Sequence, residues 1–122
     1  MNKKMTIWGR DFDIKVIFDV YSGEEVLNEQ KEALDTFCSK ADAIFSDATD
    51  IEKYCIKNNR KEVGDSITNI FKYVIPRSLF IKRDTKKHSV VLMCDYKFDE
   101  EHGIAMIFEN EKLAHIGTQD DI

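Results

Sequence analysis

Alternating apolar positions near the N-terminus predict a β-hairpin. Apolar side chains recur at every second position from Phe12 to Val20, which is the period of a strand that buries one face. The segment Met5–Trp8 can pair with this strand through a turn at residues 9–11. We therefore expect the chain to begin with two antiparallel strands.

The hydrophobic period then changes from two to between three and four. From Glu24 to Ala48 the apolar residues fall along one helical stripe, and Ser22 stands where a hydroxyl could cap the helix. Asp50 could cap a second, shorter helix that frays into the polar run 57–61. These patterns predict a long helix followed by a shorter one.

The C-terminal half predicts short strands joined by polar turns. Residues 65–75 suit either a short helix or an extended segment, and Pro76 ends whichever of them forms because it lacks an N–H. Strands rich in β-branched and aromatic residues are expected at 78–82, 89–96, 103–109 and 113–117, with a turn at Asn110 and Glu111. Their connections are short, so neighbouring strands should pair as an antiparallel meander.

The expected fold class is α+β, in a single domain of residues 1–122. An N-terminal hairpin, a long helix and one or two shorter helices should pack on the antiparallel C-terminal meander. Both faces of that meander are apolar, and one face must take the long helix. We expect the hairpin and residues 67–75 to cover the other face; the alternative is a face left open to a partner.

Composition narrows the cellular setting. No apolar run reaches the roughly 18 residues of a membrane span, and the N-terminus lacks a secretory apolar segment. We therefore expect a cytoplasmic protein that makes no membrane contact. The three cysteines are widely spaced and predict neither a disulfide framework nor a zinc site.

Charge is segregated along the chain, although the formal net charge is −5. Residues 1–52 hold six basic and 12 acidic side chains. Residues 53–88 hold ten basic and three acidic side chains, and residues 89–122 hold two basic and eight acidic ones. The basic stretch lies within an acidic chain, so direct nucleic-acid binding is not expected. An acidic surface would instead attract a basic protein partner; solvated faces with no partner are the alternative.

The densest polar cluster, residues 95–103, could by residue type supply a general acid, a general base and a metal ligand. The three histidines, however, fall at different positions along the strands of the predicted meander, so their side chains do not converge. A metal site would therefore need Asp99, Glu101 and His102 from one loop. A structural turn fits better, with Asp99 accepting backbone N–H groups and Gly103 adopting an unusual dihedral. We expect no catalytic residue, no metal and no cofactor.

One run resembles a family of small bacterial domains. It reads Tyr96-x-x-Asp99-x-Glu101-His102-Gly103-Ile104, within a wider likeness over residues 75–81, 92–113 and 116–120. Similar domains occur among immunity proteins of contact-dependent and other polymorphic toxin systems, in which a small cytoplasmic protein neutralises one cognate toxin domain. The resemblance implies such a partner and no catalytic residue. The chain departs from the family pattern at Glu111, where a glycine is common after the asparagine of the turn.

These observations together predict an immunity protein, not an enzyme, that binds a cognate toxin domain of the nuclease type. The binding residues are expected to be the carboxylates of the acidic C-terminal third: Asp95, Asp99, Glu100, Glu101, Glu109, Glu111, Asp120 and Asp121. A second acidic surface is expected on the long helix, at Glu25, Glu29, Glu32 and Asp35. The alternative function is a small hydrolase-like or metal-dependent enzyme centred on the Asp99–His102 loop.

Overall fold

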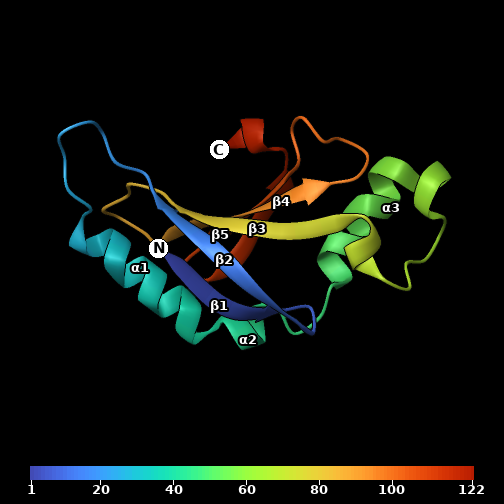
Figure 1. Ribbon diagram of the computed structural model, residues 1–122, viewed down its shortest axis with the longest axis horizontal. Coiled ribbons are helices and arrows are strands. Elements are labelled where there is room, and N and C mark those ends of the chain that lie inside the picture. The colour runs from blue at the N-terminus through green and yellow to red at the C-terminus, as the bar shows by residue number, and fades with distance from the viewer.

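The computed structural model describes residues 1–122 and contains one six-stranded sheet with three α-helices (Figure 1). The strands are β1 (Asn2–Ile7), β2 (Arg10–Phe18), β3 (Val74–Ile81), β4 (Ser89–Tyr96), β5 (Ile104–Glu109) and β6 (Lys112–Gly117). The helices are α1 (Asn28–Ser39), α2 (Ala41–Ile44) and α3 (Thr49–Val63), with short 3₁₀ turns η1 (Ile70–Lys72) and η2 (Gln119–Asp121). None of the helices combines the length and hydropathy needed to span a bilayer.

The sheet follows the order of the chain from β1 to β6. Only β2 and β3 are parallel; every other neighbouring pair is antiparallel. A parallel pair needs a long crossover, and all three α-helices lie in that connection. The α+β class, the N-terminal hairpin and the C-terminal meander predicted from the sequence are confirmed.

The two tight turns of the sheet place non-glycine residues at positive φ. Trp8 and Gly9 form the first turn, with φ of 51° and 85°, and Asn110 and Glu111 form the second, with 49° and 65°. Two consecutive positive values suit the twist of a two-residue hairpin. The first turn is thus shorter than predicted, and Glu111 takes a conformation that favours glycine.

Contacts with His88 compensate for that conformation at Glu111. The His88 backbone N–H donates to Asn110 Oδ1 at 3.0 Å, and His88 Nδ1 lies 2.7 Å from Glu111 Oε2. The Glu111 side chain is only 10% exposed. The turn is therefore held by side-chain contacts of both of its central residues.

The predicted long helix, Glu24–Ala48, is wrong in both its start and its continuity. Helix α1 begins at Asn28, ends at Ser39 and is followed by the separate one-turn helix α2. The buried side chain of Gln30 sets the start, because its Oε1 accepts the Leu27 N–H at 2.9 Å. Ser22, the predicted cap, lies outside the helix.

Gln30 also ties α1 to the sheet. Its Nε2 donates to the carbonyl of Asp19 at 2.9 Å and to that of Ile81 at 3.1 Å. Those carbonyls belong to the chain at the ends of β2 and β3. Gln30, a polar residue that the sequence alone would place on the surface, therefore joins the helical layer to the sheet.

Helix α3 is longer than predicted. It continues through the polar run that was expected to fray and ends at Val63, but it is kinked at Asn59, where φ is −137° and ψ is 42°. The Tyr96 hydroxyl donates to Asn59 Oδ1 at 2.6 Å. This contact joins the kink to the end of β4.

The core lies on one face of the sheet, beneath the α-helices. It is a single cluster of 22 buried residues, at the centre of which Phe37 of α1 packs against Phe45 and Phe108 with ring centroids 5.8 and 5.2 Å away.

Pro76 lies inside β3 instead of ending an element, at a point where the register with β4 shifts. A proline is tolerated at such an irregularity because one ladder N–H is already missing there.

The opposite face of the sheet carries no α-helix, which corrects the expectation that the hairpin and residues 67–75 would cover it. The hairpin extends the sheet sideways as β1 and β2, and Ile70 packs into the core. Figure 1 shows α1 and α2 on one side of the sheet, with η2 and the β4–β5 loop on the other. We call this side the open face; of its apolar residues, Val91 and Ala105 are buried, and Ile17, Phe80, Met93 and Ile107 are half-buried.

The register between β4 and β5 differs by one residue from the one that the predicted strands imply. Strands at 89–96 and 103–109 would set Tyr96 opposite Gly103, but Cys94 pairs with Ile104. Because side chains alternate along a strand, that slip exchanges the faces of all β5 residues. Ile107 accordingly lies half-buried on the open face, not in the core.

Candidate functional site

The eight carboxylates predicted in the C-terminal third do not form one surface. Glu109 and Glu111 lie at one end of the meander, and both are paired: Glu109 binds Lys87, and Glu111 lies beside His88 and 3.9 Å from Lys40 Nζ. At the other end Asp95 is bound by Arg77 at 2.5 Å. These three carboxylates are largely neutralised by neighbouring bases.

The remaining five carboxylates lie on two segments that meet at His102. Asp99, Glu100 and Glu101 belong to the β4–β5 loop, and Asp120 and Asp121 belong to η2. We call this set the acidic corner. The chain turns back after β6, so that residues about twenty positions apart meet beside His102.

Backbone and amide hydrogen bonds hold the acidic corner together. The Gln119 N–H donates to the His102 carbonyl at 3.0 Å, and Gln119 Nε2 donates to the Cys94 carbonyl at 3.3 Å. Gly103 makes this approach possible: its φ is +59°, and a Cβ there would lie 2.5 Å from both the Cys94 carbonyl oxygen and Gln119 Nε2. Asp121 similarly lies against Gly117, whose neighbours belong to the open face.

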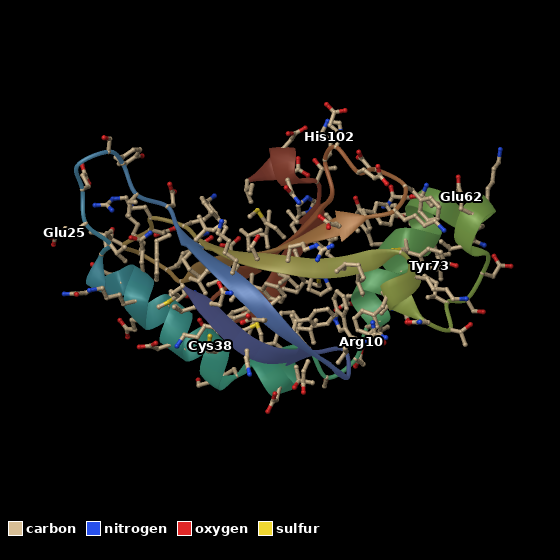
Figure 2. The ribbon with its side chains drawn as sticks, in the orientation of Figure 1. Arg10, Glu25, Cys38, Glu62, Tyr73 and His102 are labelled. Atoms are coloured by element: carbon tan, nitrogen blue, oxygen red, sulfur yellow. The ribbon has the colours of Figure 1, made fainter.

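His102 occupies the centre of the acidic corner. Its Nδ1 lies 3.0 Å from Asp99 Oδ1, and its Nε2 lies 3.4 Å from Asp120 Oδ2. The hydrogen bond to Asp99 raises the pKa of His102, and the same bond lowers the pKa of Asp99. Figure 2 shows His102 on the side of the sheet away from Cys38 of α1.

The sequence motif around His102 has a clear structural role. Asp99 Oδ1 accepts the His102 N–H at 3.1 Å, and the Asp99 carbonyl accepts the Gly103 N–H at 2.8 Å. This geometry supports the prediction of a structural turn. A general base needs a ring nitrogen free to reach a substrate, and both nitrogens of His102 face carboxylates.

Other candidate chemistry is dispersed. The three histidines have separate neighbours: His88 contacts Glu111, His102 contacts Asp99 and Asp120, and His115 lies 3.8 Å from Asp121. No group of three or more His, Cys, Asp or Glu side chains has the geometry to hold a metal ion.

The cysteines occupy apolar surroundings. Cys55 and Cys94 are buried and Cys38 is half-buried, and none forms a disulfide. Burial raises the pKa of all three thiols, that of Cys55 to about 11. A neutral thiol is a poor nucleophile and a poor metal ligand.

The second predicted acidic surface faces bases of its own. Glu29 and Glu32 of α1 line a hollow with Lys86 and Lys87, and Asp35 lines another with Lys3 and Lys31. Glu25 precedes α1, and its carbonyl accepts a hydrogen bond from Arg83 Nη1 at 3.0 Å. Figure 2 shows Glu25 and His102 at separate parts of the molecule. The two acidic surfaces are therefore distinct.

A family model for a domain of unknown function, DUF6985, matches residues 1–122. The chain belongs to the DUF6985 family. No curated protein and no solved structure matches this DUF6985 chain. Its site must accordingly be interpreted from its own residues.

The pairing of His102 with Asp99 predicts a specific pH dependence. Because the folded state raises the pKa of His102 and lowers that of Asp99, this pairing stabilises the fold fully between the ordinary pKa values of about 3.9 and about 6.5. The contribution is lost as pH rises through the raised value of His102 or falls through the lowered value of Asp99. An NMR titration of the ring should give a midpoint above about 6.5. Asp99→Asn should lower that midpoint more than Asp120→Asn, because Asp99 makes the larger contribution. A midpoint that neither substitution moves would contradict the pairing.

Proposed function

We propose that this DUF6985 chain is an immunity protein of the cytoplasm, which binds and neutralises a cognate toxin domain with nuclease activity. The acidic corner is the observation that carries the proposal. Glu100, Glu101 and Asp120 are exposed, and neither they nor Asp121 has a lysine or arginine within 4.0 Å. Asp120 and Asp121 have only histidine neighbours, so in a protein with 18 lysine and arginine side chains this group is available for an external cation.

The chemistry of a nuclease cleft matches this surface. An enzyme that cuts nucleic acid must attract a chain of phosphates, so its substrate cleft is basic. Carboxylates that occupy the phosphate positions would be drawn in at long range and would block the cleft directly. The acidic corner could therefore supply both the rate of association and the inhibition.

The open face supplies the apolar contact area that the acidic corner lacks. Phe80, Met93 and Ile107 are half-buried apolar side chains on the same side of the sheet as η2. Stable complexes usually bury an apolar centre within a polar rim. A basic partner seated on the acidic corner could extend over this face and bury it.

The test is protection of cells that produce a candidate nuclease toxin domain. Co-production of the wild-type chain should preserve growth, and the chain should co-purify with the toxin. Protection should fail in a variant that neutralises the corner: Glu100→Gln, Glu101→Gln, Asp120→Asn and Asp121→Asn. His102→Ala should still protect, whereas loss of protection in that variant, together with turnover of a substrate, would favour the enzyme alternative.

A matched control comes from the second acidic surface. Glu25→Gln, Glu29→Gln, Glu32→Gln and Asp35→Asn remove the same number of charges from the region of α1. This variant should protect as well as the wild type, and circular dichroism should show both variants folded. If only the α1 variant fails to protect, the binding surface is not the acidic corner.

A further inference from the structure

The largest hollow of the molecule, about 430 Å³, lies where β3 begins and β4 ends. Its lining includes three cations, from Lys72, Arg77 and Lys97, together with Tyr73 and Ile75. We call it the cationic hollow. The sequence pattern does not reveal it, because three of its eight lining residues, Lys72, Tyr73 and Ile75, belong to the segment 65–75, which suits either a helix or an extended structure.

The cations of the hollow are incompletely neutralised. Arg77 Nε lies 2.5 Å from Asp95 Oδ2, whereas Lys72 and Lys97 have no carboxylate within 4.0 Å. Asp95 and Glu100 are the only acidic residues of the lining. In a chain with a net charge of −5, the largest hollow thus carries a positive excess.

One wall of the hollow is aromatic and fixed in place. The Tyr73 ring stacks on Phe98 with centroids 5.6 Å apart and an interplanar angle of 29°. The Lys97 N–H donates to the Tyr73 carbonyl at 2.8 Å, so the two sides of the hollow are joined by backbone. Lys97 Nζ lies 6.0 Å from both ring centroids. A flat group could pack on this wall beside the lysine ammonium.

We propose that the cationic hollow binds a small organic anion with a flat apolar part. The carboxylate or phosphate of the ligand would lie between Lys72 and Lys97, and the flat part would lie against Tyr73 and Ile75. The volume is within the range of small-molecule sites, which begins at roughly 300 Å³. Arg77 is a third donor, held back from the ligand by its pairing with Asp95.

This site is separate from the toxin-binding proposal. Its cations are not part of the acidic corner, and only Glu100 belongs to both the corner and the lining of the hollow. Growth protection tests the first proposal, and ligand titration of the isolated chain tests the second. Either can fail without the other.

The experiment is an NMR titration of the full chain with phenyl phosphate, benzoate and inorganic phosphate. Phenyl phosphate should shift the resonances of residues 72–77 and 95–100 saturably, with a Kd on the order of 1 mM. Benzoate should bind at the same residues more weakly, and inorganic phosphate should bind about tenfold more weakly than phenyl phosphate, since it has no flat part. Equal binding of inorganic and phenyl phosphate, or the absence of saturable shifts, would overturn the proposal.

Substitutions locate the site. Lys72→Gln with Lys97→Gln should weaken phenyl phosphate binding roughly tenfold, whereas the matched pair Lys31→Gln and Lys112→Gln should leave it unchanged. Asp95→Asn should strengthen binding by releasing Arg77, and Glu109→Gln, which releases Lys87 at the other end of the sheet, should not. Equal effects of the two lysine pairs would mean that binding follows net charge and not this hollow.

Discussion

Replacing Phe37 by alanine should lower the free energy of unfolding by about 4 kcal/mol. The side chain is 0% exposed and packs against Phe45 and Phe108, so its removal leaves a cavity among rings that cannot close in fully. Equilibrium unfolding in urea, monitored by circular dichroism, measures the loss. A loss below about 1 kcal/mol would place Phe37 outside the core.

Ile107→Ala is the matched comparison, because it also truncates a large apolar side chain of the fold. Ile107 lies on the open face and is half-buried, so we expect a cost of about 1 kcal/mol. If this substitution costs as much as Phe37→Ala, the open face is covered in solution. That result would remove the apolar part of the proposed interaction surface.

Replacing Gly103 by valine should be the most destabilising substitution in the β4–β5 loop, at more than about 3 kcal/mol. A side chain there must adopt a φ of +59° and collides with the Cys94 carbonyl and Gln119. The collision should also detach η2 from the sheet and disperse the acidic corner. Thermal unfolding measures the first effect, and the NMR midpoint of His102 reports the second.

Gly9 provides the control for that substitution. Its φ is +85°, but a Cβ there would meet nothing within 4 Å. Gly9→Ala should therefore cost only the backbone term, about 1 kcal/mol, whereas Gly103→Ala should cost clearly more. Equal costs for the two alanine substitutions would show that Gly103 is needed for its dihedral alone and not for the close approach of Gln119.

The sequence predicted those parts of the fold that have a regular period. The alternation from Phe12 to Val20 predicted β2, and the β-branched segments predicted the meander. Helix limits were harder, because Gln30 caps α1 through contacts with carbonyls distant in sequence. The sequence did not show which residues face the core, because that depends on the exact length of each turn. The β4–β5 register differs by one residue from the expected one, and Ala114 of β6 is unpaired.

The candidate site was predictable in its residue types but not in its grouping. Eight carboxylates of the C-terminal third were expected to act together, and the structure separates Glu109 and Glu111 from the rest. Nothing periodic in residues 117–121 indicates that η2 folds back on the sheet. The glycines at 103 and 117 were the available signal, since each permits the close approach of a residue from η2.

The salt dependence of the association rate shows whether the acidic corner attracts a basic toxin domain. For the wild-type chain and the basic nuclease domain proposed as its partner, the rate constant should fall roughly tenfold as ionic strength rises from low to physiological values. The variant with the four neutralised corner residues should associate more slowly and show a nearly flat dependence. Rates that are the same for both chains and insensitive to salt would show that the acidic corner does not attract the partner.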